Sequence, residues 1–145
     1  FTIAHSITLT LAALKVATPP SRIVEPLIAL SIVAIAIENI RLRHVSEHPV
    51  RDYRVPTVFA FGLVHGFGFA GALSDAGLTG STLVGGLVTF NLGVEAGQAL
   101  ILVATVPIAT WLISKKPDAW SLTNLWGSIA IGLAGAWWFF ERLSG

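Results

Sequence analysis

The sequence predicts an all-α protein, a polytopic bundle of about five transmembrane helices that forms one membrane domain over residues 1–145. Hydrophobic residues make up 54% of the chain and charged residues only 12%, whereas soluble domains carry about a quarter of charged residues. The mean hydropathy is +0.76, and apolar runs close to the length of a membrane helix recur along the chain. We therefore expect a lipid bilayer to surround most side chains.

Breaks in the apolar pattern set the ends of the first three predicted helices. The first helix ends before Pro19 and Pro20, because proline restricts the residue before it and lacks a backbone donor. The second runs into a polar loop that holds much of the charge, and the third closes on a Ser-Asp-Ala-Gly sequence of turn-forming residues. These helices are predicted at residues 1–16, 22–39 and 55–73.

The fourth apolar stretch, residues 81–113, is longer than one perpendicular span requires. We expect it to be tilted, kinked near Pro107, or partly outside the bilayer. A Lys-Lys-Pro-Asp sequence ends it. The fifth helix is predicted at residues 122–140, with tryptophans near its ends as in an interfacial belt.

Basic residues in the loops indicate the orientation, because cytoplasmic loops carry more Lys and Arg. If the five spans alternate, one side receives six of these residues and the other three, so the loops at 41–54 and 115–121 are expected to be cytoplasmic. G-x-x-x-G pairs let helices approach closely in lipid and favour a compact bundle. Such pairs occur at Gly62/Gly66 and Gly93/Gly97.

Composition also limits the chemistry. The net charge of +1 gives no reason to expect a nucleic-acid partner. The absence of cysteine and methionine excludes disulfides, thiolate sites and thioether copper sites within these residues. The chain begins at Phe1 inside an apolar, helix-like run without a charged leader. We therefore expect that this chain is a fragment or a mature core and that further residues lie upstream of it.

Ionisable residues inside the predicted helices are candidates for function, because a charge at the bilayer centre costs about 2.5 kcal/mol or more. Glu95 lies in the middle of the fourth helix, and Asn91 and Gln98 share its face. A protonated glutamate in a structural hydrogen-bond network is the alternative. His65 lies in the third helix between glycines that would let a ligand approach; the alternative is a buried histidine with satisfied hydrogen bonds.

Two further candidates lie near helix ends. His5 opens a stretch in which hydroxyl side chains alternate with apolar ones. Glu38 ends the second helix, where an ion pair with Arg41 is the alternative to a functional role. Glu25 is most simply a helix-start carboxylate that complements the helix dipole.

His44 and His48 have the i, i+4 spacing of a metal-binding pair, with Glu47 beside them. Pro49 and the surrounding charges favour a solvated loop instead.

The inferred depths of these residues predict one metal site in the cytoplasmic half of the bundle. His5 and Glu38 would lie on the cytoplasmic side, and His65 and Glu95 near mid-membrane. Imidazole and carboxylate ligands suit nickel, cobalt, zinc, manganese and iron without choosing among them. We expect one of these divalent transition metals to be bound by His65, Glu95, His5, Glu38, Asn91 and Gln98.

Four motifs follow one another from residue 1 to about residue 98. They are Phe1-Thr2-x-Ala4-His5-Ser6-x-Thr8-Leu9, Glu25-x-x-Ile28-Ala29-Leu30-Ser31 running on to Glu38-Asn39, Phe61-Gly62-Leu63-x-His65-Gly66-x-Gly68-Phe69-Ala70, and Phe90-Asn91-x-Gly93-Val94-Glu95-x-Gly97-Gln98. These motifs resemble the HupE/UreJ group of bacterial membrane proteins, which are regarded as nickel or cobalt permeases or as accessory proteins of hydrogenase and urease maturation. The resemblance implies a multi-pass, metal-handling protein of the bacterial inner (cytoplasmic) membrane. The group also has an earlier helix with a His-x-x-x-Gly-x-Asp-His type motif, which would precede residue 1 and complete the site.

Three functions fit these observations. The first is a transporter or delivery protein in which His65 and Glu95 hold the ion, His5 and Glu38 act as gate or supporting groups, and an ion gradient, a partner or simple facilitation drives passage. The second is a membrane-embedded hydrolase that uses a zinc-activated water, although no H-E-x-x-H signature occurs. The third is an accessory subunit of a larger membrane complex, in which the polar stripe serves only helix packing. We favour the first, so an enzymatic activity is the less expected outcome.

Overall fold

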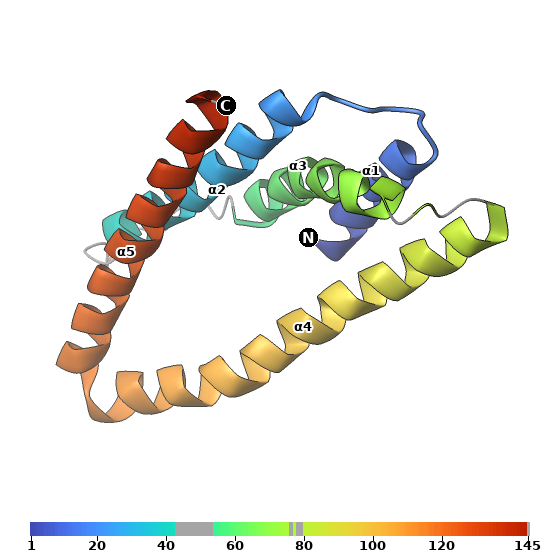
Figure 1. The fold of residues 1–145 in the computed structure, drawn as a ribbon. Helices are drawn as coiled ribbons and strands as arrows, with labels where there is room; N and C mark the ends of the chain where they lie inside the picture. Colours follow the sequence, from blue (N-terminus) through green and yellow to red (C-terminus); the bar gives the residue numbers. More distant parts are fainter. Residues whose placement is uncertain (43–53, 76, 78–79, 145) are drawn as a thin grey trace. The chain divides into compact units, whose positions relative to one another are not determined.

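The computed structural model describes residues 1–42, 54–75, 77 and 80–144. These residues form five α-helices and no strand, which confirms the all-α prediction for this part of the chain. His44, Glu47 and His48 lie outside the described residues. In chain order (Figure 1) the helices are α1 Thr2–Ala13, α2 Ser21–Leu42, α3 Arg54–Asp75, α4 Gly80–Lys115 and α5 Pro117–Ser144.

Helix α1 ends earlier than the apolar pattern predicts because a Schellman motif closes it after Ala13. The Lys15 N–H donates to the Ala12 carbonyl and the Val16 N–H to the Leu11 carbonyl, both at 2.9 Å. Lys15 itself has a φ of +58°, the left-handed conformation that this motif requires and that glycine usually supplies.

Helix α5 begins five residues before the predicted start, at Pro117. Proline suits the first position of a helix, where no backbone donor is needed, and Asp118 in the first turn complements the helix dipole. Lys116 is therefore the single residue between α4 and α5. Glu25 is the fifth residue of α2, so the prediction that it lies in the first turn of that helix is wrong.

Two of the described helices, α2 and α4, are long and apolar enough to cross a membrane. Helix α1 and the Val55–Phe69 part of α3 are apolar but shorter. Helix α4 continues through Pro107 as one helix of 36 residues. The structure thus supplies five helices in the predicted order, and the number of about five spans stays a prediction.

The chain divides into two compact units. The first comprises the described residues of 1–28 and 52–97, and the second those of 29–51 and 98–145. Helices α2 and α4 each contribute one part to each unit. Whether residues 1–145 act as a single membrane domain stays a prediction.

Helix α1 forms the core of the first unit. Figure 1 shows it beside α3, with which it makes extensive contact. Its other contacts include α4, where Leu9 packs with Leu87, Leu83 and Phe90. The face of α1 that these contacts bury consists of Ala4, His5, Thr8, Leu9 and Ala12.

The close contact of α1 with α3 depends on the first G-x-x-x-G pair. A Cβ atom added at Gly62 would lie 2.7 Å from the Phe1 carbonyl oxygen. One added at Gly66 would overlap the Thr8 hydroxyl and the His5 carbonyl oxygen. The predicted close approach is confirmed here. The second pair, in α4, differs: Cβ atoms added there would meet no atom of the described residues within 4 Å.

Glycines also mediate packing in the second unit, where α5 lies against α2. A Cβ atom at Gly132 would lie 3.2 Å from the Ala36 Cβ, and one at Gly135 would lie 3.3 Å from the Ala29 carbonyl oxygen. The buried Ser128 hydroxyl donates to the Asn124 Oδ1 of its own helix at 3.3 Å. Small residues on α5 therefore set its distance from α2.

Candidate functional site

Among the described residues of the first unit, His5 is the most buried polar residue, with 1% of its surface exposed. Aromatic rings from three helix segments surround its imidazole. Phe1 and Phe90 stack on it, with ring centroids at 5.7 and 6.1 Å and interplanar angles of 19° and 12°. Phe69 and His5 form an edge-type contact, with ring centroids at 5.8 Å and an interplanar angle of 63°. The imidazole thus lies in apolar, largely aromatic surroundings.

One nitrogen of this imidazole has a polar partner on α4. The Nδ1 atom of His5 lies 3.3 Å from the Oδ1 atom of Asn91. The same oxygen accepts a hydrogen bond from the Ser6 hydroxyl at 2.7 Å. The Asn91 Nδ2 donates to the Leu87 carbonyl at 2.9 Å, one turn earlier on α4. Helices α1 and α4 are therefore joined by a small polar network.

The other nitrogen of His5, Nε2, is buried and has no hydrogen-bond partner among the described residues. No other buried side-chain nitrogen or oxygen of the described residues lacks a hydrogen-bond partner. Leaving a buried polar atom unpaired costs about 1–3 kcal/mol, and such an atom in a native protein calls for an explanation, of which a bound ion is one. A neutral imidazole nitrogen with its lone pair free is a ligand for divalent transition metals.

His65 belongs to the same neighbourhood. It is partly buried on α3, and its imidazole and the Phe1 ring form a T-shaped contact with ring centroids 5.5 Å apart. The Phe1 ring therefore contacts both predicted imidazole ligands, His5 and His65. The structure thus brings together His5, His65 and Asn91 from three different helices.

Of the other predicted ligands, one belongs to the first unit and two belong to the second unit. Glu95 lies one turn after Asn91 on α4, and its side chain is exposed in the first unit. Glu38 and Gln98 are also exposed, and both belong to the second unit. Within the described ranges, no three His, Asp or Glu side chains gather where they could hold a metal ion together. The donors that the structure places together are two imidazoles and one amide.

Sequence reasoning missed two parts of the site. Ser6 was one of several hydroxyl residues in the first motif, and its contact with Asn91 depends on how α1 and α4 align. The aromatic residues around His5 stand in three separate motifs, and only folding brings their rings together. The signal available in the sequence was that Ser6 and these aromatic residues belong to the same motifs as the polar candidates.

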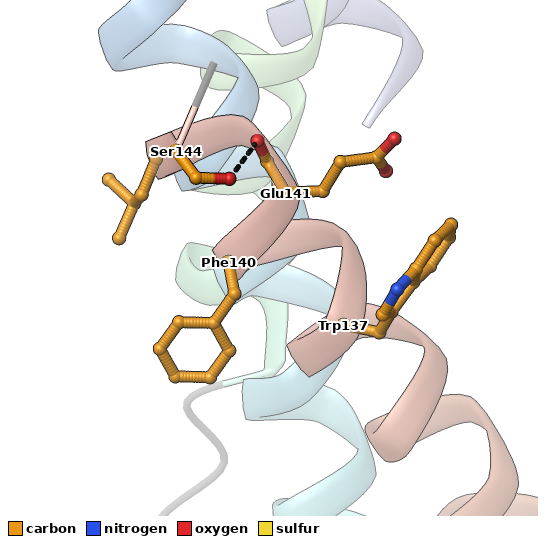
Figure 2. A pocket seen from close by; sticks show the side chains of 5 residues that line it. Trp137, Phe140, Glu141 and Ser144 are labelled. Carbon is orange, nitrogen blue, oxygen red and sulfur yellow. Dashed lines mark hydrogen bonds between the residues drawn. The ribbon is translucent and has the colours of Figure 1, made fainter.

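The second unit contains an open pocket of different character (Figure 2). It lies along the last turns of α5 and has a volume of about 550 Å³. The Ser144 hydroxyl donates to the Glu141 backbone carbonyl at 3.1 Å. The side chain of Glu141 is the carboxylate among the lining residues. The lining consists of Trp137, Phe140, Glu141, Leu143 and Ser144. None of the predicted metal ligands lines it.

Comparison with protein families gives one assignment that spans nearly the whole chain. The model of the HupE / UreJ protein family matches residues 1–142. The chain therefore belongs to the HupE/UreJ family, whose members are membrane proteins associated with nickel and cobalt handling for hydrogenase and urease. Comparisons with curated proteins and with solved structures gave no match.

Proposed function

We propose that this member of the HupE/UreJ family carries or delivers a divalent transition-metal ion, nickel or cobalt, across or within the bacterial inner membrane. The association of the family with these metals supports the choice of cargo. The two helices of spanning length support insertion into the bilayer. We expect the five helices to act as about five spans, because α1, α3 and α5 continue the apolar composition of the chain.

The unpaired Nε2 of His5 is the observation that carries this proposal. It is the buried side-chain atom of the described residues that lacks a hydrogen bond, and it belongs to the side-chain type that most often binds nickel and cobalt in the absence of cysteine. His5 is therefore assigned as a ligand of the ion, a larger role than that of a gate or supporting group.

His65 and Glu95 are assigned as further contacts of the same ion. Both imidazoles border the Phe1 ring, so displacement of that ring would let one ion pass from one imidazole to the other. Glu95 is an exposed carboxylate one turn from Asn91 on α4, a position from which it would attract a cation toward the first unit. Glu38 and Gln98, which belong to the second unit, stay predicted contacts of the ion.

A site with few strong ligands suits carriage better than hydrolysis. A catalytic zinc is usually held by three protein ligands and keeps a fourth position for water. The described residues bring two imidazoles near each other and no third imidazole or carboxylate among them. An ion that must leave again is better served by weak, successive contacts. We accordingly favour carriage, with a membrane ion gradient or a partner subunit as the driving element.

Metal binding by the purified protein in lipid nanodiscs tests this proposal. Cobalt and nickel titrations followed by calorimetry should give saturable binding that His5→Phe abolishes, because phenylalanine fills the aromatic surroundings without supplying a ligand. A His44→Asn/His48→Asn double variant is the control for adventitious binding by the other histidines and should bind as the parent does. Equal binding by His5→Phe and the parent protein would refute the assignment.

Uptake into sealed vesicles then separates the functions. Protein that binds cobalt and also admits it into proteoliposomes is a carrier. Binding without uptake would favour delivery within a larger membrane complex.

A further inference from the structure

Asn91 occupies one defined orientation in the first unit. A backbone carbonyl only accepts hydrogen bonds, so the Asn91 atom that lies 2.9 Å from the Leu87 carbonyl must be the amide nitrogen. The amide oxygen, Oδ1, is then directed toward α1, where it meets the Ser6 hydroxyl and the His5 ring. The hydrogen bond between Asn91 and Leu87 within α4 thus determines that α4 presents an amide oxygen to α1.

The amide oxygen in turn determines which nitrogen of His5 carries the hydrogen. An amide oxygen is only an acceptor, so the contact at 3.3 Å is a hydrogen bond when Nδ1 is the protonated nitrogen. The second nitrogen supports the same assignment. A hydrogen on Nε2 would be buried without an acceptor among the described residues, whereas a lone pair there needs no acceptor.

We infer that Asn91 is a positioning residue that holds His5 in the Nδ1–H tautomer and so presents the Nε2 lone pair to a divalent transition-metal ion. The metal part of this inference rests on the proposed function, but the tautomer does not. Metal-binding histidines commonly donate their second N–H to a fixed acceptor, which orients the ring and raises its basicity. Here an amide oxygen supplies that acceptor, so Asn91 supports the ligand and does not itself bind the ion.

The aromatic residues around His5 affect which ions can bind to its Nε2 atom. An ion that reaches Nε2 must exchange water for an imidazole nitrogen among Phe1, Phe69 and Phe90. Nickel and cobalt accept nitrogen ligands readily, whereas magnesium and calcium prefer oxygen ligands and part reluctantly with water. The substrate class of this site is therefore a borderline divalent ion with affinity for neutral imidazole.

The tautomer can be measured without any metal. Solid-state NMR of protein labelled with the heavy nitrogen isotope in its histidine rings distinguishes protonated from bare ring nitrogens, and the His5→Phe spectrum identifies the His5 signals. We expect a bare Nε2 and a protonated Nδ1 in the parent protein. Asn91→Asp should retain this state because it keeps an acceptor oxygen, and Asn91→Leu should lose it. Asn124→Leu, which removes an asparagine of α5, is the matched control and should leave the His5 signals unchanged.

Cobalt affinity provides the second measurement. Asn91→Leu should weaken cobalt binding by about 10- to 100-fold, as loss of an outer-shell partner does, and Asn91→Asp should restore most of it. A protonated Nε2 in the parent protein, or an unchanged tautomer in a folded Asn91→Leu variant, would overturn the inference. If the tautomer behaves as expected but the parent binds no cobalt, the proposed function fails and the positioning role of Asn91 stands.

Discussion

Gly66 of α3 lies directly against the backbone carbonyl of His5 on α1. Because Gly66 follows His65 in the chain, α3 touches α1 beside both His65 and His5. This contact brings the backbones of α1 and α3 close together beside the two histidines. Packing and site geometry consequently depend on the same residue.

Gly66→Ala should separate α1 from α3. The new Cβ would overlap the Thr8 hydroxyl and the His5 carbonyl, and the backbone atom cannot yield as a flexible side chain can. Overpacking of this kind typically costs about 1–3 kcal/mol, so thermal unfolding in nanodiscs should occur at a lower temperature and cobalt binding should weaken. Gly85→Ala in α4 is the matched control, because its Cβ would meet nothing within 4 Å in the described part of the chain. A Gly66→Ala variant as stable as Gly85→Ala would show that α1 and α3 do not pack as described.

Lys15→Gly should stabilise the end of α1. The left-handed conformation at Lys15 is unfavourable for a residue with a Cβ atom by about 1 kcal/mol, and glycine adopts it freely. The free energy of unfolding should therefore rise by about 1 kcal/mol or less, since glycine also gains freedom in the unfolded chain. Lys15→Ala removes the charge but keeps the Cβ, so it should give no such gain. Equal stabilisation by both variants would point to the charge and not to the backbone.

Glu95→Gln should lower cobalt affinity and uptake while leaving the fold intact. The substitution keeps the size of an exposed side chain but removes its negative charge. Glu141→Gln on α5 makes the same change at the pocket of the second unit and should have no effect on either quantity. Titration calorimetry and vesicle uptake would measure both variants. Indistinguishable behaviour of the two would remove Glu95 from the path of the ion.

Cobalt binding should weaken as the pH falls. An imidazole binds metal only in its neutral form, so protons compete with the ion for Nε2 of His5. Titrations at about pH 7.5 and about pH 5.5, on either side of the range in which histidine usually changes charge, should show much lower affinity at the acidic value. If the His5→Phe variant keeps some cobalt binding, the affinity of that binding should change less between the two pH values. An affinity of the parent protein that is the same at both values would argue against imidazole ligation.

The sequence was sufficient to predict the number and order of the described helices, because their apolar runs are separated by proline, glycine or charge. The predicted start of α5 is too late, because a Lys-Lys-Pro-Asp sequence is typical of a loop, whereas here Pro117 and Asp118 form the first turn of the helix. Three polar residues of the candidate site, His5, His65 and Asn91, could be named from their types and predicted depths. Their roles could not, because whether Asn91 binds an ion or orients His5 depends on the alignment of α1 with α4. The division of the chain into two units has no signal in the periodicity of α2 or α4, each of which contributes to both units.

If the chain carries an ion as proposed, the aromatic ring of Phe69 would affect the rate at which the ion exchanges. It contacts both His5 and Phe90 and yet is 47% exposed, so it forms part of the boundary between the imidazole and the outside of the first unit. Rotation of this ring would uncover the histidine without altering the histidine's own hydrogen bonds. Rotation of this ring would then be the slow step of both binding and release of the ion. A smaller side chain at position 69 would shorten the residence time of the ion, while the equilibrium occupancy of the site would stay nearly constant.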